Sequence, residues 1–266
     1  MKIGISNLSW LKKDNFKIIN YSNKKINFLE YSYHNLIRFH PNLSLKEIRK
    51  FYSKNMTPLY SMQSLLYKTK DCYIFGNRSQ RKNFIKELKN KIFLAKKLKT
   101  KILVFGSPKN KKNISSFNKK QMAEIFESTF FQLAEYSKKK NICICIEANP
   151  KFYKNDFLIY TKDALNIVKK INSPNIRLNF DLGTAISNGE EYKNLLSKNL
   201  KFVGHIQISL PKLKNIISNK TKIIAFVKFL KRIKYKEKIS VEQIYLKKNN
   251  FDNVLKTINF ISNLSK

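Results

Sequence analysis

Short apolar runs alternate with longer amphipathic stretches along the whole chain, a pattern typical of repeated βα units. The apolar runs predict strands at 2–6, 26–31, 58–63, 101–106, 142–147, 176–181, 202–205 and 239–242. Apolar residues at helical spacing predict helices near 11–20, 84–98, 122–133, 221–230 and 254–261, and a capping box at 44–47 predicts another to about 53. Eight such units without a linker predict a single (β/α)₈ TIM barrel over residues 1–266.

Four of the predicted strands end in a residue that can bind a metal. These residues are Glu147, Asp181, His205 and Glu242, and their intervals each fit one βα unit. The carboxyl ends of the strands in a parallel barrel converge on one mouth, so the four side chains are expected to meet around a single cation. Each residue alone has an ordinary alternative, a salt-bridged carboxylate or a core imidazole, and the prediction depends on their occurring together.

Period-2 alternation assigns side chains to the two faces of each strand. In the fifth strand Cys143 and Cys145 share the inward face with Glu147, which predicts interior packing for both thiols. In the sixth strand Arg177 faces inward and is expected to pair with an interior acid. Glu30 in the second strand is expected to face the mouth. The three cysteines show no CxxC spacing, so neither a disulfide framework nor a zinc-thiolate site is predicted.

Three carboxylates and one imidazole form a hard ligand set, which favours Mn²⁺, Mg²⁺ or Co²⁺ over Zn²⁺. Such an ion polarises a carbonyl group and stabilises the enediolate that forms when the neighbouring C–H proton leaves. The reaction needs an acid and a base on opposite sides of that carbon. Glu147 and Glu242 are predicted to flank the substrate and to exchange these roles.

The chain carries 54 Lys and Arg against 17 Asp and Glu, a formal net charge of +37. Such a charge attracts anions, including nucleic acid through non-specific contacts, although an AT-rich coding bias is the favoured origin of the lysines. The first residues lack the apolar run of a signal peptide, and no apolar stretch reaches the length of a membrane span. A cytoplasmic protein without membrane association is therefore predicted, and association into a homo-oligomer is left open.

The sequence resembles the sugar phosphate isomerase/epimerase family of the xylose isomerase-like TIM-barrel superfamily, which includes D-tagatose 3-epimerase-like and hydroxypyruvate isomerase-like enzymes. The matching segments are 2–6, 104–108, 146–150 with Tyr153, 179–183, 204–209 and 240–242. The resemblance implies a Glu-Asp-His-Glu metal site whose two glutamates transfer the proton. It implies a small sugar or sugar phosphate as substrate, and the candidate substrate contacts are Lys109, Asn149, Tyr153, Gln207 and Lys212.

The sequence departs from the family pattern at two places. Family epimerases commonly have a histidine three positions after the metal-binding aspartate and an arginine shortly after the metal-binding histidine. Here those neighbourhoods hold Thr184 and Pro211-Lys212, which leaves the substrate preference open. Endonuclease IV is similar to the same superfamily, but its trinuclear zinc site needs many histidines and this chain has three.

These observations predict a metal-dependent sugar or sugar phosphate isomerase or epimerase of carbohydrate metabolism. One alternative is a catalytically altered barrel that binds polyanions or another protein. The other is a metal-dependent dehydratase or phosphodiesterase that uses the same residues.

Overall fold

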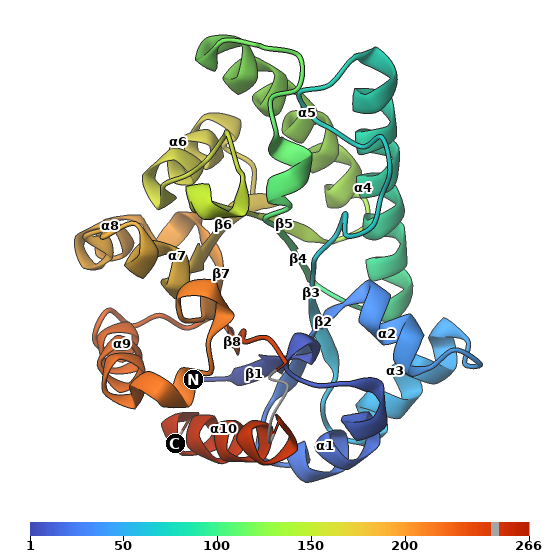
Figure 1. The fold of residues 1–266 in the computed structure, drawn as a ribbon, viewed down its shortest axis with the longest axis vertical. Helices are drawn as coiled ribbons and strands as arrows, with labels where there is room; N and C mark the ends of the chain where they lie inside the picture. Colours follow the sequence, from blue (N-terminus) through green and yellow to red (C-terminus); the bar gives the residue numbers. More distant parts are fainter. Residues whose placement is uncertain (246–249, 266) are drawn as a thin grey trace.

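The computed structural model, which describes residues 1–245 and 250–265, is a closed barrel of parallel strands surrounded by helices (Figure 1). The strands follow one another around the barrel in chain order, and β1 pairs with both β2 and β8. This confirms the TIM-barrel prediction. The strands are β1 Ile3–Ser6, β2 Phe28–Ser32, β3 Leu59–Gln63, β4 Ile102–Phe105, β5 Cys143–Glu147, β6 Ile176–Asp181, β7 Val203–Ile208 and β8 Ile239–Val241.

The helices form the outer layer, and their ends follow the capping signals of the sequence. Ser44 and Glu47 form the predicted capping box, which begins α3. Helices α2, α6, α7 and α8 lie in stretches without a specific helix prediction. The α-helices are α1 Asn15–Ser22, α2 Tyr33–Phe39, α3 Leu45–Lys54, α4 Arg78–Leu98, α5 Lys119–Lys138, α6 Thr161–Ile171, α7 Leu182–Ser187, α8 Tyr192–Asn199, α9 Lys220–Arg232 and α10 Asn250–Ser265.

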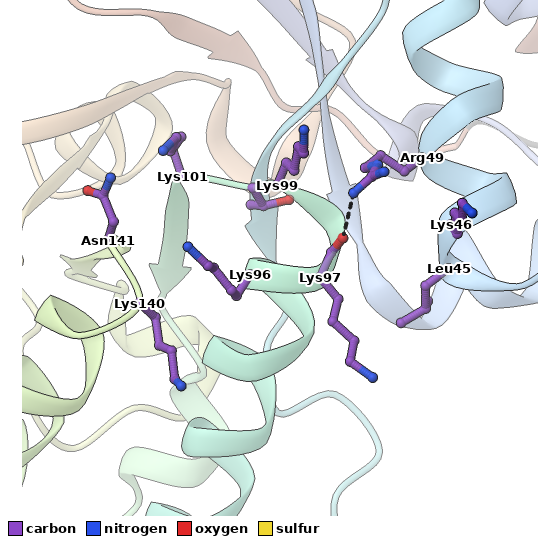
Figure 2. A pocket seen from close by; sticks show the side chains of 10 residues that line it. Leu45, Lys46, Arg49, Lys96, Lys97, Lys99, Lys101, Lys140 and Asn141 are labelled. Carbon is purple, nitrogen blue, oxygen red and sulfur yellow. Dashed lines mark hydrogen bonds between the residues drawn. The ribbon is translucent and has the colours of Figure 1, made fainter.

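A hollow of about 780 Å³ lies at the end of the barrel where β4 and β5 begin, between α3 and α4 (Figure 2). A second hollow of about 410 Å³ shares Lys46, Arg49 and Lys99 with the first and extends to the start of β3. We call the two together the basic groove. It is lined by Leu45, Lys46, Arg49, Lys50, Ser53, Pro58, Leu59, Lys96, Lys97, Leu98, Lys99, Thr100, Lys101, Lys140 and Asn141.

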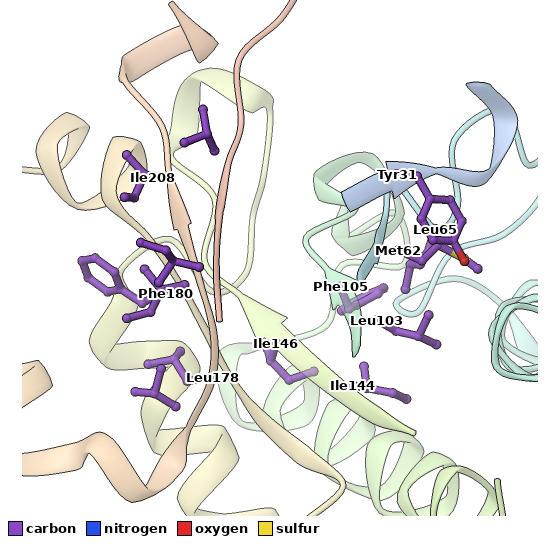
Figure 3. Close-up of a cluster of buried hydrophobic side chains, with 14 of the residues drawn as sticks. Tyr31, Met62, Leu65, Leu103, Phe105, Ile144, Ile146, Leu178, Phe180 and Ile208 are labelled. Atoms are coloured by element: carbon purple, nitrogen blue, oxygen red, sulfur yellow. The ribbon is translucent and has the colours of Figure 1, made fainter. Parts of the chain in front are cut away.

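The main apolar core lies between the strands and the helices. The ring of Phe105 on β4 lies 4.9 Å from that of Phe130 on α5, which stacks on Phe126 at 4.3 Å. Alternate residues of β5 and β6, such as Ile146 and Phe180, are buried on the same outward side (Figure 3). These outward faces agree with the strand alternation predicted from the sequence, and the opposite faces point into the barrel.

Near the starts of the strands, one sequence prediction about the barrel interior is confirmed and another is wrong. Cys145 is fully buried against Ile102 and Val104, which confirms its packing role. Arg177 does not pair with an interior acid; its Nη1 donates to the carbonyl of Lys201 at 2.6 Å. Because Arg177 is the second residue of its strand, its long side chain reaches backbone carbonyls at that end of the barrel. Within the described ranges, no helix is both long and apolar enough to cross a membrane.

Candidate active site

Three of the predicted ligands stand at the mouth of the barrel. Glu147 and Asp181 are the last residues of β5 and β6, and Glu242 directly follows β8. Because all strands run parallel, these three carboxylates belong to the same end of the barrel. Asp181 and Glu242 are each 8% exposed, whereas Glu147 is partly exposed. The strand parity predicted from sequence therefore places each of them correctly.

The three carboxylates oppose one another's ionisation. The pKa of Glu147 is raised to about 8, mainly by burial and also by the charge of Asp181, against the opposing effect of Lys111. Burial also raises the pKa of Glu242 well above its usual range, with added repulsion from Glu147 and Asp181. Burial raises the pKa of Asp181 as well. The mouth thus disfavours ionisation of its carboxyl groups, and a bound cation would offset this effect.

Asp181 is held in place by the residues that begin α7. Its Oδ1 accepts a hydrogen bond from the Thr184 amide at 2.6 Å, the usual contact of a helix N-cap. Its Oδ2 accepts one from the Ser209 hydroxyl, also at 2.6 Å. Gly183 lies so close to that hydroxyl that a β-carbon at this position would overlap it. Position 183 therefore requires glycine because the chain packs closely there against Ser209, the residue that follows β7.

Glu147 is positioned by two amides and a buried lysine. Asn149 donates to Oε1 at 2.7 Å and Asn179 donates to Oε2 at 3.1 Å. The ammonium of Lys111, which is fully buried, donates at 3.0 Å to both the Glu147 backbone carbonyl and Asn149 Oδ1. Because the lysine occupies the amide oxygen of Asn149, the amide nitrogen must face the carboxylate. Burial lowers the pKa of Lys111 to about 7, although the charge of Glu147 opposes this shift.

Sequence reasoning missed Lys111 and selected Lys109 from the same loop. The loop forms a short 3-10 helix, η3 Pro108–Lys111, in which Lys109 is exposed and Lys111 turns inward. In a chain this rich in lysine, no local signal marks the buried one. The pairing with a strand-end glutamate appears only once β4 and β5 are adjacent.

His205 lies deeper in the barrel than predicted. Strand β7 continues to Ile208, so His205 is in the middle of its strand, and the prediction that it ends the strand is wrong. The strand register pairs Asp181 with Gln207 and places His205 opposite Asn179. Gln207 is therefore the inward residue of β7 at the level of the carboxylates.

The imidazole of His205 is engaged by other strands. Its Nε2 lies 2.9 Å from Glu30 Oε2 and 3.0 Å from the Ser240 hydroxyl, while its buried Nδ1 has no hydrogen-bond partner. Burial opposes ionisation of Glu30, but hydrogen bonds and the charge of His205 outweigh it and lower the pKa of this carboxyl. Glu30 also accepts a hydrogen bond from Gln207 at 2.8 Å. The ligand role of His205 remains a prediction.

Side-chain amides connect the group around Glu147 and Lys111 with the group around Glu30 and His205. Asn179 donates both to Glu147 and, at 2.6 Å, to Gln207 Oε1, and Gln207 in turn donates to Glu30. The polar network therefore crosses the barrel from Lys111 to His205 through side chains of four strands and of the loops that hold Lys111 and Asn149. Such a network fixes each carboxylate in one orientation because every displacement breaks a buried hydrogen bond.

The five predicted substrate contacts fall into three groups according to their burial. Asn149 and Gln207 are buried and hydrogen-bonded within the network. Tyr153 is half-buried on η4 Lys151–Tyr153, where burial and the charges of Glu242, Asp181 and Glu147 raise the pKa of its hydroxyl. The remaining two, Lys109 and Lys212, are exposed on loops.

The donor set fits a divalent cation in chemistry but is not a ready-made site. Three crowded carboxyl groups supply hard oxygen donors, and a bound cation would favour their ionised forms. The imidazole predicted to complete the set is bonded to Glu30. In residues 1–245 and 250–265, no three His, Cys, Asp or Glu side chains converge closely enough to hold a metal ion as they stand. A cation would therefore have to draw the carboxylates together.

The chain belongs to the xylose isomerase-like TIM barrel family, whose sequence profile matches residues 27–264. This confirms the family resemblance. The match includes β2 through β8 and all four predicted ligands. No curated protein matches the chain in sequence.

Solved structures with the same fold include several sugar epimerases. The 3-keto-D-glucoside 4-epimerase YcjR from E. coli superposes with a TM-score of 0.80 at 13% identity, covering 100% of this chain and 99% of that one. A D-psicose 3-epimerase crystallised in the presence of D-fructose gives 0.78 at 14% identity, covering 98% and 96%. The IolI protein with a bound zinc atom gives 0.76 at 14% identity, covering 100% and 97%.

Proposed function

We propose that the protein is a metal-dependent isomerase or epimerase of a small sugar or sugar phosphate. The observation that carries this proposal is the pair Glu147 and Glu242, two carboxyl groups with raised pKa values that enter one mouth from β5 and from the end of β8. A group that accepts and returns a proton near neutral pH works best when its pKa lies near that pH. The pKa of about 8 for Glu147 meets this requirement.

In the proposed reaction, Glu147 removes the proton from the carbon next to the substrate carbonyl. Asn149 and Asn179 orient its two oxygens, and Lys111 fixes the direction of the Asn149 amide. Glu242, which follows β8, is proposed to flank the substrate on its other side and to deliver a proton there, which gives epimerisation or isomerisation according to the carbon that receives it.

The carboxylates of Glu147, Asp181 and Glu242 are proposed to hold a divalent cation. When bound, such an ion would polarise the substrate carbonyl and stabilise negative charge on its oxygen. His205 would join these ligands only through Nδ1, since Nε2 is committed to Glu30 and Ser240. The zinc atom in IolI and the D-fructose present with the psicose epimerase support this assignment by analogy of fold.

Substrate contacts are proposed for Tyr153, Lys109 and Lys212, with Asn149 and Gln207 contributing through the network. The two exposed lysines suit an anionic group such as a phosphate, which would lie at the rim of the mouth. The amides are already hydrogen-bonded, so their contribution to substrate binding would require exchange of a partner.

The first test is binding of Mn²⁺ and Co²⁺ by isothermal titration calorimetry. We expect one ion per chain, with affinity weakened about tenfold or more in Asp181→Asn and unchanged in Glu124→Gln, which alters an exposed residue of α5. His205→Gln tests whether the imidazole is a metal ligand or only a partner of Glu30, because the affinity for the ion should fall only if Nδ1 binds it. Absence of divalent binding at millimolar concentration would contradict the metal site.

The second test detects proton transfer without knowledge of the product. Ketoses and their phosphates are incubated with the protein in D₂O, and deuterium at the carbon next to the carbonyl is measured by NMR. We expect incorporation that is lost in Glu147→Gln and Glu242→Gln but retained in Glu124→Gln. Incorporation that persists in both active-site variants would contradict the proposed roles.

A further inference from the structure

The basic groove lies at the opposite end of the barrel from the carboxylates. It is bordered by the residues that precede β4 and β5, whereas Glu147 and Asp181 terminate their strands. Lys101 and Lys140 project from these turns, and Lys96 from the end of α4 (Figure 2). The groove is therefore structurally separate from the proposed active site.

Cationic side chains dominate the groove to an extent that composition does not explain. Lysine and arginine make up about one residue in five of the chain, 54 of 266. Among the ten residues that line the larger hollow, seven are basic, and no Asp or Glu lines either hollow. The basic residues of the groove are Lys46, Arg49, Lys50, Lys96, Lys97, Lys99, Lys101 and Lys140.

The fold accounts for only part of this cluster. Lys96, Lys97 and Lys99 lie at the C-terminal end of α4, where cations interact favourably with the helix dipole. Lys101 and Lys140 lie in turns outside the helices, and Lys46 and Lys50 do not lie in the last turn of α3. The helix dipole therefore does not explain these four lysines. One groove cation has a hydrogen bond within the groove, from Arg49 Nη1 to the Lys97 carbonyl at 3.5 Å. The mutual repulsion of these cations would be relieved by an anionic partner.

The shape and lining of the groove define the chemistry of that partner. Two connected hollows of about 780 and 410 Å³ offer charges over a longer path than one phosphate group occupies. No aromatic side chain lines either hollow, so bases have no platform on which to stack. Lysines act as point charges that contact phosphates without reading a sequence.

We propose that the basic groove binds the phosphate backbone of a nucleic-acid strand, independently of base sequence. The barrel would thus carry two functions at opposite ends, with small-molecule chemistry at the mouth and polyanion binding at the strand starts. The groove shares no residue with the proposed metal or substrate site. This inference therefore does not depend on the sugar chemistry.

The test must separate the groove from the diffuse charge of the whole surface. Binding of a fluorescein-labelled single-stranded DNA is measured by anisotropy over a series of salt concentrations. The groove variant is Lys96→Gln/Lys99→Gln/Lys101→Gln/Lys140→Gln. The matched control removes the same charge from exposed lysines of α8 and α9 as Lys193→Gln/Lys198→Gln/Lys222→Gln/Lys228→Gln.

Each phosphate contact contributes about 0.7 to the slope of log affinity against log salt for a single strand. We expect the groove variant to lower this slope by about 2 to 3 and the control by less than about 0.7. Double variants, Lys96→Gln/Lys99→Gln and Lys101→Gln/Lys140→Gln, should each give about half of the effect. Circular dichroism confirms that each variant is folded.

Several outcomes would overturn the proposal. Equal loss in the groove variant and the control would show that binding is diffuse. Affinity for inorganic triphosphate, with none for DNA, would assign the groove to a small anion. Binding to phosphatidylserine vesicles without binding to DNA would assign it to a lipid surface.

Discussion

Replacing Glu147 with glutamine should change how the stability of the protein depends on pH. The folded carboxyl group has a pKa of about 8, against a value of 4.5 when unperturbed. Between these values the folded chain keeps a proton that the unfolded chain releases. The contribution of Glu147 to stability is therefore fully present below pH 4.5 and is lost as the pH rises through 8.

The magnitude follows from proton linkage. One proton retained by the folded state lowers the free energy of unfolding by about 1.4 kcal/mol for each pH unit. From about pH 5 to about pH 7 this amounts to about 2.7 kcal/mol, and solvent contact of the partly exposed side chain reduces it to about 2 kcal/mol. The lowered pKa of Lys111, about 7, acts mainly above this range, because its contribution is present above 10.5 and is lost as the pH falls through 7.

The assay is urea denaturation in the presence of a chelator at several pH values. Wild type should lose about 2 kcal/mol more than Glu147→Gln between about pH 5 and about pH 7. Glu124→Gln, on the exposed face of α5, should follow wild type. Parallel curves for wild type and Glu147→Gln would refute the reasoning that crowded burial keeps this carboxyl group protonated.

Three further changes test other parts of the structure, each by chemical denaturation. Glu30→Ala should cost about 3 to 5 kcal/mol because it removes the carboxylate beside the buried His205 and leaves Nε2 only the Ser240 hydroxyl, and a loss below about 1 kcal/mol would show that the pair is not important. Phe130→Ala should cost about 3 to 5 kcal/mol through the cavity it leaves among the rings of β4 and α5, whereas Phe131→Ala, which truncates an exposed neighbour, should have little effect. Ser44→Ala should cost about 1 kcal/mol by removing the cap of α3, and an unchanged free energy of unfolding would contradict the capping role.

The sequence predicted the barrel and the three mouth carboxylates because both depend on local periodicity. The alternation of side chains along each strand places Glu147 and Asp181 on the inward face, independently of residues outside that strand. The depth of His205 could not be predicted in this way. It depends on where β7 ends and on its register against β6, which shifts between Leu178 and Asn179.

The buried partners were harder to predict than the strands. Lys111 differs from its exposed neighbour Lys109 only by the turn of a short 3-10 helix, and periodicity is not informative over so few residues. Glu30 was expected to face the mouth, but the geometry of the closed barrel brings it to an imidazole that lies 175 positions further along the chain. Contacts of this range depend on tertiary geometry alone.

The pairing of Glu30 with His205 and Gln207 has a consequence for synthesis of the chain. Glu30 leaves the ribosome early, whereas both of these partners come from β7. An incomplete barrel would hold this carboxylate in its interior with only Ser61 and Gln63 of β3 as partners and without the imidazole, which is energetically unfavourable. Nascent chains that stop before β7 should therefore keep β2 exposed to water or to a chaperone, and burial of this charge should coincide with the addition of the last strands.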